Sequence, residues 1–286
     1  MGIGITNNYD ALTSLIELAD DGNVEAQFDL GRQYLKNKDF EQAVEYLTEA
    51  ANQGHSISQR ILGDCFYNGE GVETDSKQAF LWYKKAAEQN NIYSLNMVGY
   101  CFYNGIGVNK NYDQAFIWFT KTAEYDDELA QIMLGDCCFL GRGVEKNFCE
   151  AFLWYKKAAE QDNVYALRML GSCFFYGNGI VKDLHKAFLW YRKAAEQDDL
   201  IAQRMLGVCF YFGKGVDKNI NQALLWYKKA EKQGDKIAHN FLKDHYSYES
   251  NRDLIRKTHT EAGNQKDIYA FNYVEEKLKK MREIYF

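Results

Sequence analysis

Cysteine and histidine are the residue types in this sequence most able to bind a metal or to act as nucleophiles. The chain has seven cysteines and five histidines. Structural zinc sites need Cys-x-x-Cys pairs, or cysteine and histidine at similarly short spacings. No two cysteines here are separated by two residues, and no histidines share a metal-ligand spacing. We therefore expect no metal site, no cofactor and no catalytic cysteine or histidine.

Glycine pairs of the form Gly-x-Gly could in principle build phosphate-binding loops. They occur five times, at residues 69/71, 105/107, 141/143, 177/179 and 213/215. They lack the third glycine of a dinucleotide-binding motif and the Gly-Lys-Ser/Thr of a P-loop. Glycine also serves tight loops, because it adopts a positive φ without steric cost. We expect that second role, and a protein that is not an enzyme.

The regular spacing of these residues is the strongest signal in the chain. Glycine, cysteine and tryptophan each recur every 36 residues: at Gly63, Gly99, Gly135, Gly171 and Gly207; at Cys65, Cys101, Cys137, Cys173 and Cys209; and at Trp82, Trp118, Trp154, Trp190 and Trp226. Such a period is typical of a repeat array, whose units bury their apolar faces only by stacking. The periodic cysteines and the Trp-Tyr pairs are then expected in the core, and the Lys84–Lys85 pair on a solvated helix face.

A row of disulfides is not expected from the periodic cysteines. Neighbouring helices pack about 8–10 Å apart, whereas the Cα atoms of a disulfide lie within about 7 Å. Free thiols favour a reducing compartment. The first nine residues also lack the basic and apolar segments of a signal peptide. We therefore expect a cytoplasmic location.

Each repeat reads as two short amphipathic helices. In the unit from Ile57 to Gln89, apolar residues fall at helical spacing before and after the Gly-x-Gly pair. Asn or Asp precedes each predicted helix as an N-cap, at positions 75, 111, 147, 183 and 219 and at 91, 127, 163, 199 and 235. The fold class predicted is all-α, a right-handed superhelical α-solenoid of stacked helix-turn-helix repeats.

The ends of the array differ from its centre, as expected for capping units. We predict an N-terminal capping helix within residues 1–25 and a short repeat, resembling a tetratricopeptide repeat, in residues 26–56. Five 36-residue repeats follow in residues 57–235, and C-terminal capping helices in residues 236–286. One of these is an amphipathic helix over 268–281.

The units resemble Sel-1-like repeats (SLR), longer-looped relatives of the tetratricopeptide repeat. The resemblance rests on these residues of one unit: Leu170, Gly171, Phe174, Gly177, Gly179, Asp183, Lys186, Ala187, Trp190, Tyr191, Lys193, Ala194, Ala195 and Glu196. It implies a solenoid that acts as a non-enzymatic adaptor or scaffold for protein–protein interaction. Some members of the family are immunity proteins that block a toxin, so an inhibitor of a toxin or effector enzyme is the alternative function.

Positions that differ between repeats could form the binding surface. Counted from the first-helix glycine, positions −3, +1 and +5 share one helix face. They are Arg60, Asp64 and Asn68; Asn96, Tyr100 and Asn104; Ile132, Asp136 and Leu140; Arg168, Ser172 and Tyr176; and Arg204, Val208 and Phe212. We expect this stripe on the concave side of the array. The alternative is that these positions are only weakly constrained.

Charge and hydropathy limit the classes of partner. The net charge is −6, which argues against nucleic acid or an anionic membrane. No apolar stretch approaches the roughly 20 residues of a membrane helix. Arginine and tyrosine in the stripe favour a protein partner with an acidic group and an apolar anchor. The sequence leaves the oligomeric state open, with a monomer favoured.

Overall fold

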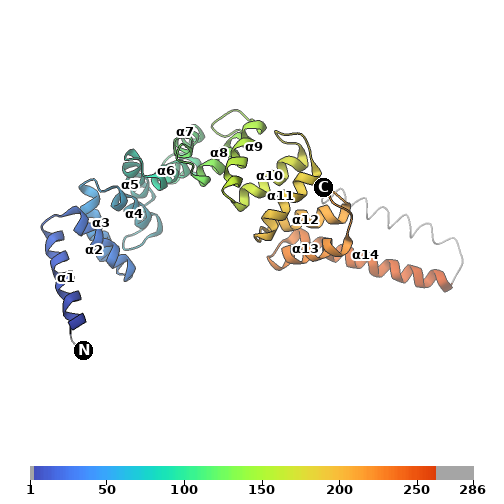
Figure 1. Ribbon diagram of the computed structural model, residues 1–286, viewed down its shortest axis with the longest axis horizontal. Helices are drawn as coiled ribbons and strands as arrows, with labels where there is room; N and C mark the ends of the chain where they lie inside the picture. Colours follow the sequence, from blue (N-terminus) through green and yellow to red (C-terminus); the bar gives the residue numbers. More distant parts are fainter. Residues whose placement is uncertain (1–2, 262–286) are drawn as a thin grey trace. The chain divides into compact units, whose positions relative to one another are not determined.

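The structure is a computed structural model that describes residues 3–261. Within this range it is all α-helical, as predicted, and contains no strand (Figure 1). The helices are α1 Ile3–Asp20, α2 Val24–Lys36, α3 Phe40–Asn52, α4 Ser56–Asn68, α5 Ser76–Glu88, α6 Ile92–Asn104, α7 Tyr112–Ala123, α8 Glu128–Leu140, α9 Phe148–Glu160, α10 Val164–Tyr176, α11 Leu184–Glu196, α12 Leu200–Phe212, α13 Ile220–Lys232 and α14 Lys236–Glu261.

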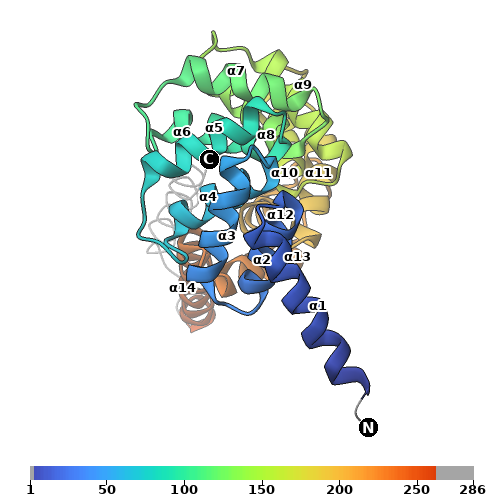
Figure 2. The same cartoon turned by 90° about the vertical axis from the view of Figure 1, so that its left-hand side faces the viewer.

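The helices form two compact units, Met1–Ala158 and Ala159–Phe286. In the first unit α2 pairs with α3, α4 with α5 and α6 with α7; in the second, α10 pairs with α11 and α12 with α13. Second helices also contact the first helix of the next pair: α3 contacts α4 (Figure 2), α5 contacts α6 and α7 contacts α8 in the first unit, and α11 contacts α12 in the second. The predicted division into caps and repeats stays a prediction. The helix expected over 268–281 lies outside the described residues.

The predicted N-caps are confirmed. Asp183 accepts the backbone N–H of Lys186 at the start of α11, and Asp199 accepts that of Ala202 at the start of α12. The residue before each first-helix cap has a positive φ, as at Asp162 and Asp198. His55 is a cap that the pattern did not predict: its ring nitrogen accepts the Ser58 N–H at the start of α4.

The first-helix glycines allow the two helices of a repeat to approach closely. A Cβ built on Gly171 would lie 2.6 Å from Cδ1 of Tyr191, on the paired helix. The equivalent glycines face Tyr83, Phe119, Tyr155 and Tyr227 in the same way. These rings are almost completely buried. The periodic glycine therefore makes room for the largest core side chain of each repeat.

The Gly-x-Gly loops connect the first and second helices of each repeat. Both glycines have positive φ, as predicted. The second one also packs against the backbone of the preceding repeat: a Cβ on Gly215 would lie 2.0 Å from the Leu184 carbonyl oxygen, and one on Gly71 would lie 2.1 Å from that of Phe40. Only glycine fits at this contact without a backbone shift.

The prediction that the Trp-Tyr pairs form the core is only half right. The tyrosine of each pair is fully buried, whereas most of the tryptophans are half-buried. A lysine three residues on covers the tryptophan ring; Lys85 Nζ lies 3.8 Å from the centroid of Trp82, and Lys157 Nζ 4.4 Å from that of Trp154. These lysines therefore do not belong to a purely solvated face. The five periodic cysteines are buried, as predicted.

Candidate protein-binding surface

Position −3 of the predicted stripe forms joints between repeats at three of its five residues, Asn96, Arg168 and Arg204. There the side chain contacts the residue that caps the first helix of the next repeat. The contacts are Asn96 Nδ2 to Asp127 Oδ1 at 2.7 Å, Arg168 Nε to Asp199 Oδ2 at 3.2 Å and Arg204 Nη1 to Asp235 Oδ2 at 3.0 Å. In the short repeat, outside the predicted stripe, Phe28 takes the same place, with its ring centroid 4.5 Å from that of His55. We call these four contacts the inter-repeat joints.

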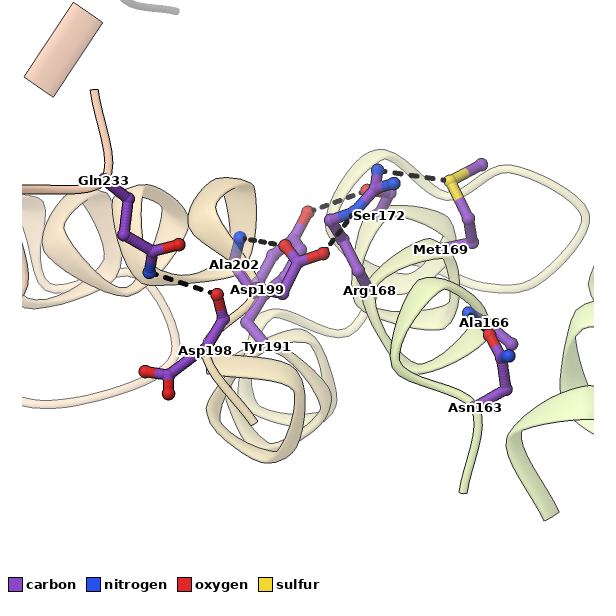
Figure 3. A network of polar contacts seen from close by, with 10 residues as sticks. All are labelled: Asn163, Ala166, Arg168, Met169, Ser172, Tyr191, Asp198, Asp199, Ala202 and Gln233. Atoms are coloured by element: carbon purple, nitrogen blue, oxygen red, sulfur yellow. Dashed lines mark hydrogen bonds and ion pairs between the residues drawn. The ribbon is translucent and has the colours of Figure 1, made fainter. Parts of the chain in front are cut away.

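The joints correct the expected role of the two stripe arginines, of which Figure 3 shows Arg168. Arg168 and Arg204 already hold carboxylates of their own chain, those of Asp199 and Asp235. They are therefore not free to bind a partner's carboxylate. Asn96 is likewise buried within its joint, and Ile132 is a core residue with 8% of its surface exposed.

Position +1 is also engaged within the chain at three repeats. The buried tyrosine of the second helix donates its hydroxyl hydrogen to this residue: Tyr83 to Asp64 at 2.8 Å, Tyr155 to Asp136 at 2.7 Å and Tyr191 to Ser172 at 3.1 Å. A buried hydroxyl without a partner would cost free energy. Val208, at the same position, is only 5% exposed and is also not a surface residue. Tyr100 is exposed.

Position +5 is the part of the stripe that reaches solvent. Asn68, Asn104, Leu140 and Tyr176 are exposed at the ends of their helices. Phe212 is half-buried and its ring lies against that of Tyr211. The stripe is therefore not one continuous binding face, and its placement on a concave side stays a prediction.

A cavity of about 570 Å³ lies over the first helices of the first unit. Its lining includes Arg32 and Leu35 of α2, Arg60 and Asp64 of α4, and Tyr93 and Met97 of α6. Three consecutive first helices thus contribute to a single hollow. It coincides with the N-terminal end of the stripe.

Asp64 is the centre of a polar cluster at the cavity wall. It accepts hydrogen bonds from Arg60 Nη1 at 2.8 Å, Tyr83 Oη at 2.8 Å and Tyr93 Oη at 3.0 Å. The Arg60 guanidinium also lies 5.2 Å from the Tyr93 ring centroid. Burial, together with the nearby Asp64 carboxylate, raises the pKa of Tyr93 to about 12. The cluster is internally satisfied and gives the cavity a fixed wall.

Arg32, Asn68 and Glu70 supply the remaining polar groups of the cavity. Arg32 is exposed, and its guanidinium carbon lies 5.4 Å from the centroid of the Phe28 ring. Arg32 was not among the predicted site residues, because the predicted stripe did not include the short repeat. Counted from Gly31, however, Arg32 occupies position +1.

The described part of the chain offers no group of three potential metal ligands. None of the described helices has the length and apolar character needed to cross a membrane. The lining of the cavity combines hydrogen-bonding side chains with apolar ones.

The sequence was compared with models of known protein families. The Sel1 repeat model matches six segments, residues 24–55, 56–91, 92–125, 129–163, 164–199 and 200–235. The chain belongs to the Sel1 repeat family. This confirms the resemblance drawn from the repeat pattern and adds the short unit as a full member. Sel1 repeats mediate protein–protein interactions, and the match indicates no catalytic domain.

Solved Sel1 repeat structures resemble this one. The protective antigen c5321 of uropathogenic Escherichia coli, which displays an SLR fold, is 32% identical with a TM-score of 0.75. The match covers 95% of this chain and 56% of that protein, so the chain spans little more than half its length. A Sel1 repeat protein from Oxalobacter formigenes is 33% identical with a TM-score of 0.69, over 74% of this chain and 87% of that one. A comparison with curated protein sequences gave no significant match.

Proposed function

We propose that this Sel1 repeat protein is a non-enzymatic scaffold that binds a segment of a partner protein in the cavity of its first unit. The observation that carries the proposal is the convergence of α2, α4 and α6 on one hollow of about 570 Å³. Binding sites of this kind are concave, with an apolar lining and a few fixed polar groups.

The lining indicates the chemistry of the bound segment. Arg32 would bind a carboxylate of the partner, because guanidinium groups pair with carboxylates in bidentate geometry. Leu35 and Met97 would contact an apolar side chain, and the exposed amide of Asn68 would bond the partner's backbone. The Asp64 cluster would keep the wall rigid, which lowers the entropy cost of binding.

Partner capture from a lysate of the organism that makes the protein tests this proposal. The wild type is compared with an Arg32→Ala/Asn68→Ala variant, and a Tyr176→Ala variant serves as a surface control in the second unit. A protein recovered by the wild type and the control, but lost with the double variant, supports the cavity. Equal recovery by all three, with unchanged helicity by circular dichroism, would show that the cavity is not the site.

The same capture separates a scaffold from an inhibitor. If the recovered protein is an enzyme, its activity is measured with increasing amounts of this chain. Complete loss of activity at one chain per enzyme would replace the scaffold proposal with the inhibitor function. Unchanged activity in the complex supports the scaffold.

We also propose that the protein works in a reducing compartment such as the cytoplasm. The support is that its seven cysteines are free thiols, six of them buried. Alkylation of cells with a maleimide reagent before lysis tests this, because a cytoplasmic protein is labelled only by the membrane-permeant form of the reagent.

A further inference from the structure

The second helices carry large apolar residues that are exposed in repeat after repeat. Leu81 of α5, Ile117 of α7 and Leu153 of α9 occupy equivalent positions and are 48%, 56% and 57% exposed. In the second unit Leu225 of α13 is also exposed. Large apolar residues exposed at the same position of successive second helices are candidates for an interaction surface.

The stacking of repeats does not require an apolar side chain at these positions. The short repeat provides a control within the chain, because α3 pairs and stacks like the other second helices. The residue of α3 equivalent to Leu81 is Glu45, and the one equivalent to Lys85 is Glu49. The fold therefore accepts glutamate at both positions, yet Leu or Ile occupies the first of them in all five later repeats.

Lysines lie one helical turn after the exposed apolar residues of α5 and α9, whereas the acidic residues Asp113 and Glu150 lie one turn before Ile117 and Leu153. Helix α5 carries three lysines against one glutamate, in a chain whose net charge is −6. Lys84 and Lys85 lie one helical turn after Leu81, and Lys157 lies one turn after Leu153. Lys85 and Lys157 are held over tryptophan rings, so their ammonium groups have defined positions. We call Leu81, Ile117, Leu153, Lys84, Lys85 and Lys157 the second-helix face.

We propose that the second-helix face binds an acidic amphipathic helix of a partner protein. The cations fit carboxylates of that helix, and the three apolar residues fit its leucine-type side chains. The face lies on α5, α7 and α9, whereas the cavity lies over α2, α4 and α6. The two sites use different helices, so the chain can engage two partner segments at once.

A synthetic helical peptide tests the proposal. The probe is a fluorescein-labelled peptide of glutamate and leucine, with leucine at intervals of three and four residues, and its affinity is read by fluorescence anisotropy. Both Leu81→Ser/Ile117→Ser/Leu153→Ser and Lys84→Glu/Lys85→Glu/Lys157→Glu are expected to weaken binding about tenfold or more. The matched control Lys110→Glu/Lys146→Glu/Lys182→Glu changes the charge equally on the loops and is expected to retain most of the affinity.

Four outcomes would overturn the proposal. The first is no binding of the probe, and the second is equal binding by all variants. The third is equal binding of a scrambled peptide of the same composition, since that would reflect charge alone. The fourth is that the face variants retain probe affinity but lose another interaction. Loss of sedimentation with phosphatidylglycerol vesicles would assign the face to a membrane, and loss of concentration-dependent dimerisation would assign it to a second copy of the chain. The Arg32→Ala/Asn68→Ala variant should bind the probe like wild type, which separates this site from the cavity.

Discussion

Arg168 of α10 and Asp199, the N-cap of α12, connect two consecutive first helices through the Asp199 carboxylate. Asp199 accepts the Ala202 N–H at 2.7 Å as the cap of α12, and it also accepts Arg168 Nε at 3.2 Å. The side chains are only 15% and 16% exposed. A single carboxylate therefore both starts a helix and holds that helix to the preceding repeat (Figure 3).

The first prediction concerns this pair. Arg168→Ala should lower the free energy of unfolding by about 1–2 kcal/mol, because it removes a partly buried charge-assisted hydrogen bond. Asp199→Asn retains the cap and removes the charge. A double-mutant cycle by chemical denaturation should give a coupling energy of about 1 kcal/mol. The exposed pair of Arg192 and Glu196 is the control, and its removal should change stability little. A coupling energy of zero for Arg168 and Asp199 would contradict the joint.

The second prediction separates backbone strain from contact between repeats. Gly213 and Gly215 both have positive φ. A Cβ on Gly213 would lie 3.6 Å from its nearest neighbour, Cβ of Lys218, whereas a Cβ on Gly215 would lie only 2.0 Å from the Leu184 carbonyl oxygen. Gly213→Ala should cost about 1–2 kcal/mol from φ alone. Gly215→Ala should cost about 1–3 kcal/mol more, because the backbone of Leu184 must move. Thermal unfolding measures both, and equal losses would mean that the contact between repeats adds nothing.

The third prediction compares two neighbours in one repeat. Tyr191 is fully buried, so Tyr191→Ala should cost about 3–5 kcal/mol by forming a cavity. Trp190 is half-buried beneath Lys193, whose Nζ lies 4.8 Å from the ring centroid. Trp190→Ala should therefore cost clearly less, although the side chain is larger. Urea unfolding measures the free energy of unfolding of both variants. A greater loss of stability for Trp190→Ala than for Tyr191→Ala would place the tryptophan in the core.

The fourth prediction concerns thiol reactivity. Burial raises the pKa of the Cys101 and Cys173 thiols to about 12, and burial raises that of Cys138 to about 11. Such thiols stay protonated near neutral pH, and the thiolate is the reactive form. Cys149 is the exposed one of the seven cysteines. Titration with an aromatic disulfide reagent should show one fast thiol per chain, absent in Cys149→Ser, and the other thiols only after denaturation. Several fast thiols in the native protein would argue against the buried positions.

The repeat unit and its helix ends could be predicted from the sequence because stacking imposes them identically on every copy. Each periodic residue type meets one physical requirement that recurs in the repeats: glycine allows close approach or a positive φ, Asn or Asp caps a helix, and the tyrosine fills the core. The degree of burial of the tryptophan could not be predicted, because a period alone does not separate a core ring from one that a lysine covers.

The binding surface was harder to predict because divergence between repeats does not mean freedom from packing. At Asn96, Arg168 and Arg204 the side chain of position −3 matches the cap of the next repeat, as Arg168 matches Asp199 and Arg204 matches Asp235. Both pairs are separated by 31 residues, so the sequence did hold a signal. The cavity depends on three first helices together, and no single repeat contains it.

The inter-repeat joints give the array a fixed order. The repeat with Arg168 at position −3 fits a following repeat whose first helix is capped by Asp199. Ile132, at the same position of another repeat, cannot donate a hydrogen bond to a carboxylate. Moving the repeat of Ile132 in front of that of Asp199 would leave this partly buried acid without its arginine. The common period of 36 residues makes the repeats look interchangeable. Shuffling, duplicating or deleting one of them nevertheless changes the contacts between position −3 and the capping residue at both ends of that repeat. Protein engineers who recombine these repeats should therefore transfer each arginine together with the aspartate that follows it.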